Sequence, residues 1–298
     1  MIYLIDENDP ALLEFVDCFF QGSSLVDIHG AGDHGYGGTR WQVPAHAEER
    51  KKVYEKSLKE FKKMFALDKN LVKPLSKIIS WNGKIVLDFG CGTGGLSVPL
   101  SEKGAKVFAA DPVLLNLHAL RCRTTYLGLD DDTIQTVQVD CKPPLPFMNE
   151  TFHALICNSV IEFIPFHRPL YVKEFLRVLK VGGFLIISGE NGMFPRNYYT
   201  KMWFPRFRRS EAIQKNQPFG TTHGELQRWI RESVYRVEDL STRNYFNSFD
   251  KLSDRIIQPK VSSIVRALNT VFKACCRLIQ VPGDIFLPYS TFIFQKCR

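Results

Sequence analysis

The spacing of apolar and polar positions changes near residue 84, and from there to residue 190 it keeps one rhythm. Short, nearly continuous apolar runs alternate with longer amphipathic segments. The short runs predict strands at 84–89, 106–111, 133–140, 153–160 and 184–190. The longer segments predict helices at 94–103, 112–128 and 168–183, each followed or closed by glycine. Strands that alternate with helices at this spacing, and that are apolar throughout, are typical of a parallel sheet covered on both faces.

The same rhythm returns near the end of the chain. Residues 221–233 predict a helix, and Thr222 with Glu225 forms a capping box at its start. Two more strands are predicted at 235–246 and 290–297. The sequence therefore predicts an α/β fold built on a doubly wound sheet of seven strands.

The remaining segments set the expected domain organisation. We expect an N-terminal helical cap with a flexible glycine-rich loop at 1–80, a core at 81–190, an insertion at 191–220 that covers the substrate, and the C-terminal part of the sheet at 221–298, with a helical insertion at 250–288. Within that last insertion, residues 260–280 predict a basic amphipathic helix. Such a helix either packs on its own domain as a lid, the interpretation we favour, or lies on a membrane surface.

Composition and charge narrow the class of protein. The 298 residues carry 39 Lys and Arg against 31 Asp and Glu, and the resulting charge of +8 favours anionic partners, although a merely basic surface explains it as well. The eight cysteines form no CxxC pair and no regular framework, which is typical of reduced thiols. The N-terminus is acidic where a signal peptide is basic, and no apolar run reaches the roughly 18 residues of a membrane span. We therefore expect a cytoplasmic protein.

The chemistry starts at the turn Gly90-Cys91-Gly92-Thr93-Gly94, which follows the first predicted strand. Glycines between a strand and a helix allow the backbone to approach a ligand closely, and dinucleotide-binding enzymes use such turns. Here Asp88 stands two residues before the first glycine, and its charge would repel the pyrophosphate of a dinucleotide. S-adenosylmethionine (SAM) carries an ammonium and a sulfonium instead, so the acid favours SAM over NAD.

Two further acids follow the next two predicted strands. Asp111 ends the second strand, where a carboxylate can accept both ribose hydroxyls, and Asp140 ends the third strand, followed by Cys141. Each has a structural alternative, because Asp111 also precedes Pro112 and a helix, and Asp140 precedes a proline-rich turn. Because the carboxyl ends of parallel strands form the ligand-binding edge of an open α/β sheet, we expect these acids to serve one ligand.

The stretch from VLDFGCGTGG through AAD to VDCKPPLPFMNETFHALICNSVIEFI resembles the class I SAM-dependent methyltransferases, in particular the type 11 and 12 domains that act on small molecules. The resemblance covers roughly residues 84–190 and implies a Rossmann-like seven-stranded sheet whose last strand runs antiparallel. It places Asp88 and the glycines at the methionine end of SAM, Asp111 at the ribose, Asp140 with Cys141 at the adenine, and Asn158 near the methyl group. The cofactor-binding residues that it implies are Asp88, Gly90, Cys91, Gly92, Gly94, Asp111, Pro112, Asp140, Cys141 and Asn158.

Residues that act on the methyl acceptor are harder to find, because methyl transfer from a sulfonium needs a base only when the nucleophile must lose a proton. The candidate bases are His223 and His167, and solvated loop histidines are the alternative reading of both. The aromatic and basic insertion predicts substrate contacts from Tyr199, Arg206, Arg208 and Arg209. It faintly resembles methyltransferases that act on glycans or their lipid-linked precursors, where a histidine is expected at the place of Tyr199. We expect no metal site, because no ligand spacing is present.

These features predict a SAM-dependent methyltransferase that modifies an oxygen or nitrogen of a small molecule, with an anionic, glycosylated or lipid-linked acceptor. One alternative is an RNA methyltransferase, which the basic charge permits, although no RNA-binding module and no catalytic tetrad with adjacent prolines follows the fourth strand. The other alternative is a non-catalytic SAM-binding partner subunit, against which the intact glycine turn and acids argue. Contact of the basic amphipathic segment with a membrane surface stays open as the alternative to a lid.

Overall fold

The computed structural model describes residues 72–130, 132–139, 142–164, 168–192, 220–241, 271 and 289–298. The strands in these ranges are β1 Ile85–Phe89, β2 Lys106–Asp111, β3 Ile134–Gln138, β4 Phe152–Asn158, β5 Leu179–Glu190, β6 Val237–Asp239 and β7 Tyr289–Lys296. The helices are α3 Ser97–Ser101, α4 Leu114–Tyr126, the 3-10 turn η1 Ile161–Phe163, α5 Arg168–Val178 and α8 His223–Arg231, and residues 72–75 form a further helical turn.

The seven strands form one sheet in the order β3-β2-β1-β4-β5-β7-β6. Strands β1, β2 and β3 pair in parallel, as do β4 and β5. The last strand, β7, lies between β5 and β6 and runs antiparallel to both. The predicted Rossmann-like sheet with an antiparallel last strand is therefore confirmed.

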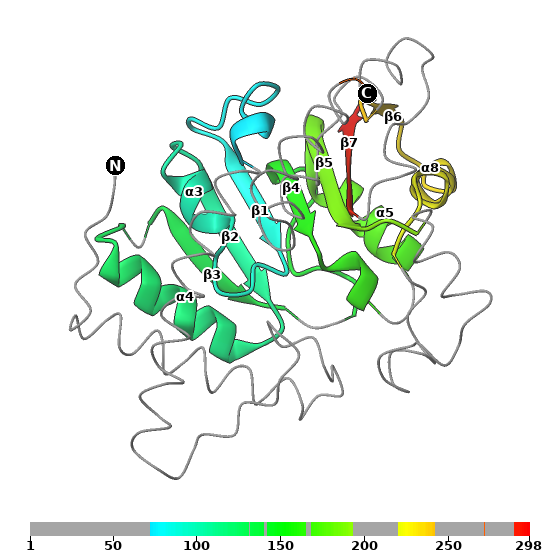
Figure 1. The fold of residues 1–298 in the computed structure, drawn as a ribbon. Coiled ribbons are helices and arrows are strands. Elements are labelled where there is room, and N and C mark those ends of the chain that lie inside the picture. The colour runs from blue at the N-terminus through cyan, green and yellow to red at the C-terminus, as the bar shows by residue number, and fades with distance from the viewer. Residues whose placement is uncertain are drawn as a thin grey trace. The chain divides into compact units, whose positions relative to one another are not determined.

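The chain forms two compact units, Met1–Asp140 and Cys141–Arg298. In the first unit, α4 packs along β2 and β3, and α3 packs on β2 (Figure 1). Leu87 of β1, Val107 of β2 and Leu120 of α4 are completely buried. The apolar runs seen in the sequence therefore form the core of this unit, and the polar residues that end β1 and β2 gather beside the turn that follows β1.

In the second unit, α5 packs against β5 and against α8 (Figure 1). The capping box predicted for α8 is present, because the Thr222 hydroxyl accepts from the Glu225 backbone N–H while the Glu225 carboxylate accepts from the Thr222 N–H. The apolar face of α8, with Leu226 and Trp229, is buried. This capped start fixes the position of His223, the first residue of the helix.

The boundary between α5 and β5 differs from the prediction, which ran the helix to residue 183. The helix ends at Val178 and β5 begins at Leu179. The pairing with β4 passes from Phe152↔Leu179 to Ala154↔Phe184, so the strand loops out residues 180–183 at an irregularity. The glycines at 182 and 183 therefore form a bulge inside a strand, and they do not stop the helix.

Large parts of several predicted segments lie outside the described residues: the N-terminal helical cap and loop before residue 72, residues 193–219 of the substrate-covering insertion, and all but Val271 of the amphipathic insertion. Val271 is helical and 63% exposed. The described residues include no helix long and apolar enough to cross a membrane.

Candidate functional site

The glycine-rich turn after β1 is held against the end of β2 by its own backbone. The N–H groups of Gly90 and Cys91 both donate to the carbonyl oxygen of Ala110, at 2.7 and 3.0 Å. Gly90, Gly92 and Gly94 have φ angles of 73°, 53° and 83°, in the left-handed region that glycine adopts readily. The turn therefore needs glycine at each of these predicted positions for its shape, apart from any contact with a ligand.

Asp111, the last residue of β2, joins this turn to the start of α4. Its Oδ2 accepts a hydrogen bond from the Gly92 N–H at 2.9 Å. Its Oδ1 accepts from the Val113 N–H at 2.9 Å and from Nδ2 of Asn116 at 3.1 Å. An ionised carboxylate has about four acceptor sites, so these three bonds leave Asp111 room for a further donor. The two readings of Asp111, ligand-binding acid and structural cap, are thus compatible in one residue.

Asp88 lies behind the turn and is only 2% exposed. Its Oδ2 accepts a hydrogen bond of 2.6 Å from the hydroxyl of Ser97, the first residue of α3. This contact joins the end of β1 to the helix that follows the glycines. The placement of Asp88 at the methionine end of SAM remains a prediction.

The two carboxylates make the turn electronegative. Burial, followed by the charges of Asp88 and Asp111, raises the pKa of the Cys91 thiol well above its usual value. Burial also raises the pKa of Asp111, while the three hydrogen bonds that its carboxylate accepts act against that rise. A buried site of this charge suits a ligand that carries positive charge and disfavours the pyrophosphate of a dinucleotide. These residues therefore fit SAM as the group held at the turn.

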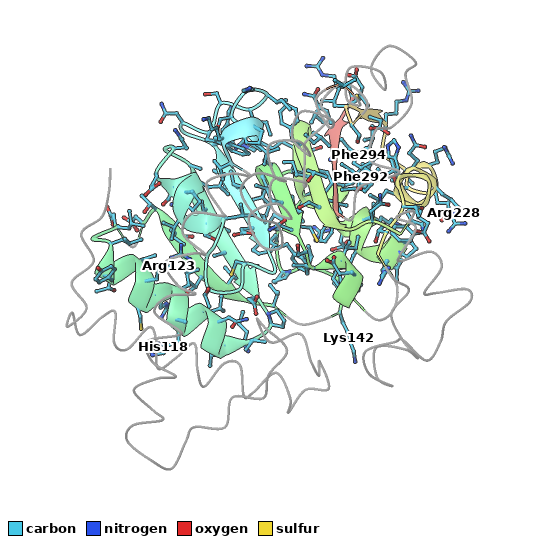
Figure 2. The ribbon with its side chains drawn as sticks, viewed as in Figure 1. His118, Arg123, Lys142, Arg228, Phe292 and Phe294 are labelled. Atoms are coloured by element: carbon cyan, nitrogen blue, oxygen red, sulfur yellow. The ribbon has the colours of Figure 1, made fainter. Side chains whose placement is uncertain are left out.

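Arg123 contributes to this region, and the sequence reasoning missed it. This residue of α4 is 1% exposed, and its Nη1 donates to the Thr93 carbonyl oxygen in the glycine-rich turn at 3.2 Å (Figure 2). The hydroxyl of Thr93 is buried and has no hydrogen-bond partner in the described structure. Helical spacing from the buried residues Ala119 and Leu120 places Arg123 on the covered side of α4, and this was the available signal.

Of the other predicted cofactor residues, Gly94 and Pro112 lie within the described ranges, whereas Asp140 and Cys141 do not. Gly94 lies so close to Leu120 that a Cβ on the glycine would stand 2.1 Å from Leu120 Cδ1. Pro112 is exposed, and its carbonyl accepts from Gln138 Nε2 at 3.2 Å. The predicted site residues outside the described ranges are Asp140, Cys141, His167, Tyr199, Arg206, Arg208 and Arg209.

Asn158 ends β4 and makes a contact that the sequence did not predict. The hydroxyl of Ser188 in β5 donates to Oδ1 of Asn158 at 2.5 Å. Asn158 is partly exposed, whereas Ser188 is buried. The placement of Asn158 near the methyl group remains a prediction.

His223 is held firmly in the second unit. Its Nε2 lies 2.5 Å from Oδ2 of Asp239 in β6, and its ring stacks on Phe292 with centroids 5.1 Å apart. Phe292 and Phe294 project from β7 beside α8 (Figure 2). Burial raises the pKa of Asp239, but hydrogen bonds from His223, Ser241 and Gln227 outweigh it and lower the pKa to about 2. His223 is thus an oriented histidine with an ionised partner, in contrast to the solvated loop histidine that was the alternative.

Comparison with known proteins places residues 87–187 in the family model described as a methyltransferase domain. The chain is 28% identical over 193 residues to the ubiquinone biosynthesis O-methyltransferase of Xylella fastidiosa, a match that covers 62% of this chain and 74% of that enzyme. It is 32% identical over 119 residues to the mitochondrial ubiquinone biosynthesis O-methyltransferase of Mus musculus, covering 40% of this chain. That match spans 30% of the mouse enzyme's length.

Among solved structures, the chain resembles a protein from Galdieria sulphuraria described as a candidate sarcosine dimethylglycine methyltransferase. The TM-score is 0.51 and the sequence identity 16%, with 92% of this chain and 98% of that chain covered. At this identity the likeness concerns the fold, and it agrees with the strand order of the sheet.

Proposed function

The chain belongs to the class I SAM-dependent methyltransferases, and we propose that it transfers the methyl group to an oxygen atom of a small, amphipathic or anionic acceptor. The observation that carries this proposal is the pair of buried carboxylates, Asp88 of β1 and Asp111 of β2, beside a glycine-rich turn that Asp111 itself holds. Bound there, SAM supplies a methyl group already activated by the positive sulfur, so the protein's main tasks are alignment and exclusion of water.

The proposed roles of the turn follow from its donors and acceptors. Asp111 keeps acceptor capacity beyond its three hydrogen bonds, which suits the ribose hydroxyls. Asp88 places negative charge behind the turn, which suits the cationic end of the cofactor. Arg123 stabilises the turn through the Thr93 carbonyl and is proposed as a positioning residue.

Two features support a small acceptor modified at oxygen. The relatives from Xylella fastidiosa and Mus musculus are both named O-methyltransferases of ubiquinone biosynthesis. The insertion at 191–220 is rich in aromatic and basic residues, including Tyr199 and Arg206, a composition that suits an acceptor with apolar and anionic parts. We propose that this insertion covers the acceptor.

His223 is our proposed general base for the acceptor hydroxyl. The contact with Asp239 orients the imidazole, as a base that must face the acceptor hydroxyl requires. Stacking on Phe292 restricts the ring further. His167, the other candidate, remains a prediction from the sequence.

The test of this function is turnover. The protein is incubated with SAM and a panel of small hydroxylated and aminated acceptors, and release of S-adenosylhomocysteine is measured with each. Methylation at oxygen supports the proposal. Saturable SAM binding without turnover on any acceptor would favour the non-catalytic partner subunit, and methylation confined to RNA would favour the RNA methyltransferase.

A further inference from the structure

Asn158 and Ser188 are cross-strand partners at the carboxyl ends of β4 and β5. Partners in register direct their side chains to the same face of a sheet, and here the two meet in a hydrogen bond of 2.5 Å from the Ser188 hydroxyl to Asn158 Oδ1. Ser188 is 6% exposed, whereas Asn158 is partly exposed. A buried hydroxyl thus supports an amide that a ligand can reach.

The polar row continues into β7, because Ser188 also pairs with Thr291. Asn158, Ser188 and Thr291 therefore share one face across three strands. Two positions earlier on the same face stand Ile156, Ile186 and Ile293, all buried and apolar. A change from apolar to polar side chains at the end of three neighbouring strands is typical of the edge where an open α/β sheet binds its ligand.

The backbone beside this row is constrained as well. Ser159 has a φ of 55°, which is uncommon for a residue other than glycine, and its N–H donates to the Ser188 carbonyl at 2.6 Å. A Cβ on Gly189 would stand 2.6 Å from Glu162 Oε2, so a side chain at this position would displace the Glu162 carboxylate. Residues held in such conformations cluster at ligand-binding sites, where the surrounding structure must impose them.

We propose that Ser188 is a positioning residue that turns the amide of Asn158 so that its NH2 group donates to the acceptor oxygen. The Ser188 hydroxyl occupies the amide oxygen, which leaves the two N–H donors for a ligand. A donor at this place recognises an oxygen that presents lone pairs, so the acceptor class is a hydroxyl or a carboxylate bound through its oxygen. This inference rests on the proposed function and names the group that recognises the acceptor oxygen.

The transfer that this arrangement serves is balanced without a further reactant. The acceptor hydroxyl loses its proton to base or solvent, and an oxygen lone pair forms the new bond to the methyl carbon. The bond from that carbon to sulfur breaks, and its electron pair remains on sulfur as a neutral thioether. A neutral amine nitrogen offers a single lone pair, which the new bond to the methyl carbon consumes, so it cannot also accept from the Asn158 N–H during the transfer.

The experiment compares Ser188→Ala, Ser188→Thr and Asn158→Asp, with Ser290→Ala as the matched control. Ser290 is equally buried but pairs with Gly189, one residue further along β5, and so lies on the opposite face. The probes are 3,4-dihydroxybenzoate and its diamino counterpart, which share size and carboxylate but differ in the reacting atom. SAM affinity is measured by calorimetry for each variant.

We expect turnover of the dihydroxy probe and not of the diamine. Its kcat/KM should fall about tenfold in Ser188→Ala and about a hundredfold in Asn158→Asp, where a carboxylate replaces both N–H donors. It should recover in Ser188→Thr and stay unchanged in Ser290→Ala. Full activity of Asn158→Asp would overturn the inference, because the amide oxygen would then face the acceptor. Turnover of the diamine alone, or of neither probe with SAM bound, would overturn it too. Absence of SAM binding in the unaltered protein would instead remove the proposed function.

Discussion

The backbone N–H of Gly92 and the carboxylate of Asp111 are joined by a hydrogen bond of 2.9 Å, which connects the glycine-rich turn after β1 to the last residue of β2. The same carboxylate also binds the Val113 N–H and the Asn116 side chain at the start of α4. One acid therefore shapes the turn and the following helix, and the proposed ribose contact is added to a residue with a structural role.

Replacing this carboxylate should affect stability and cofactor affinity together. In Asp111→Ala, three donors lose their acceptor, and we expect the free energy of unfolding to fall by about 1–3 kcal/mol. SAM affinity should fall by at least about tenfold, as expected for loss of a charged acceptor. Chemical denaturation and calorimetry measure the two effects, with Asp132→Ala, an exposed acid, as the control. SAM affinity equal to that of the control would exclude Asp111 from the cofactor site.

A side chain at position 94 should clash with Leu120, and Gly128 provides a control without such a clash. Gly94 has a φ of 83°, and a Cβ there would stand 2.1 Å from Leu120 Cδ1, which is completely buried. Gly128 also has a positive φ, of 61°, but nothing lies within 4 Å of a Cβ built on it. We expect Gly94→Ala to destabilise the protein by about 1–3 kcal/mol more than Gly128→Ala, the usual cost of overpacking. Equal melting temperatures for the two variants would show that the methyl group of an alanine at position 94 fits beside Leu120.

The hydrogen bonds to Asp239 predict a dependence of stability on pH. Its pKa is lowered from 3.8 to about 2 in the folded protein, so folding favours the ionised form. The stabilisation that follows is fully present above the unfolded pKa and is lost as the pH falls through the folded one. The difference in unfolding free energy between the natural protein and Asp239→Asn should therefore be constant above pH 5 and shrink as the pH falls toward about 2. A difference that stays constant across this range would contradict the lowered pKa.

The proposed base predicts a kinetic effect that a structural histidine would not cause. In His223→Gln, kcat/KM should fall by about a hundredfold or more, and the rise of kcat/KM with pH on the acid side should disappear. Gln227→Ala is the control, because the Gln227 amide also donates to Asp239 but does not act as a base. If both variants lower activity equally and keep the same pH profile, then His223 only supports the fold.

The sequence predicted the elements of the sheet because strand and helix periods are local properties. Both ends of β2, at residues 106 and 111, were predicted correctly. The capping box of α8 was predicted from Thr222 and Glu225 alone. The end of α5 was missed because a glycine pair after a helix usually ends it, whereas here pairing with β4 draws Leu179 into a strand. Tertiary pairing overrode a local signal at that point.

The contacts within the candidate site were less accessible to sequence reasoning. Asp88 and Asp111 were found because acids at strand ends beside glycines form a pattern, but the bond from Arg123 to Thr93 joins residues thirty positions apart. Ser188 and Asn158 are also thirty positions apart in the sequence. Such pairs depend on the register of strands and on the packing of α4, which only the folded chain specifies.

The most direct measurement is a calorimetric titration of the protein with SAM and, separately, with NAD. The two buried carboxylates beside the glycine-rich turn favour a cationic ligand and repel a pyrophosphate. We predict saturable binding of SAM, weakened in Asp111→Ala, and no binding of NAD. Saturable NAD binding, or SAM binding that is unaffected by loss of Asp111, would contradict the assignment of the cofactor to this turn.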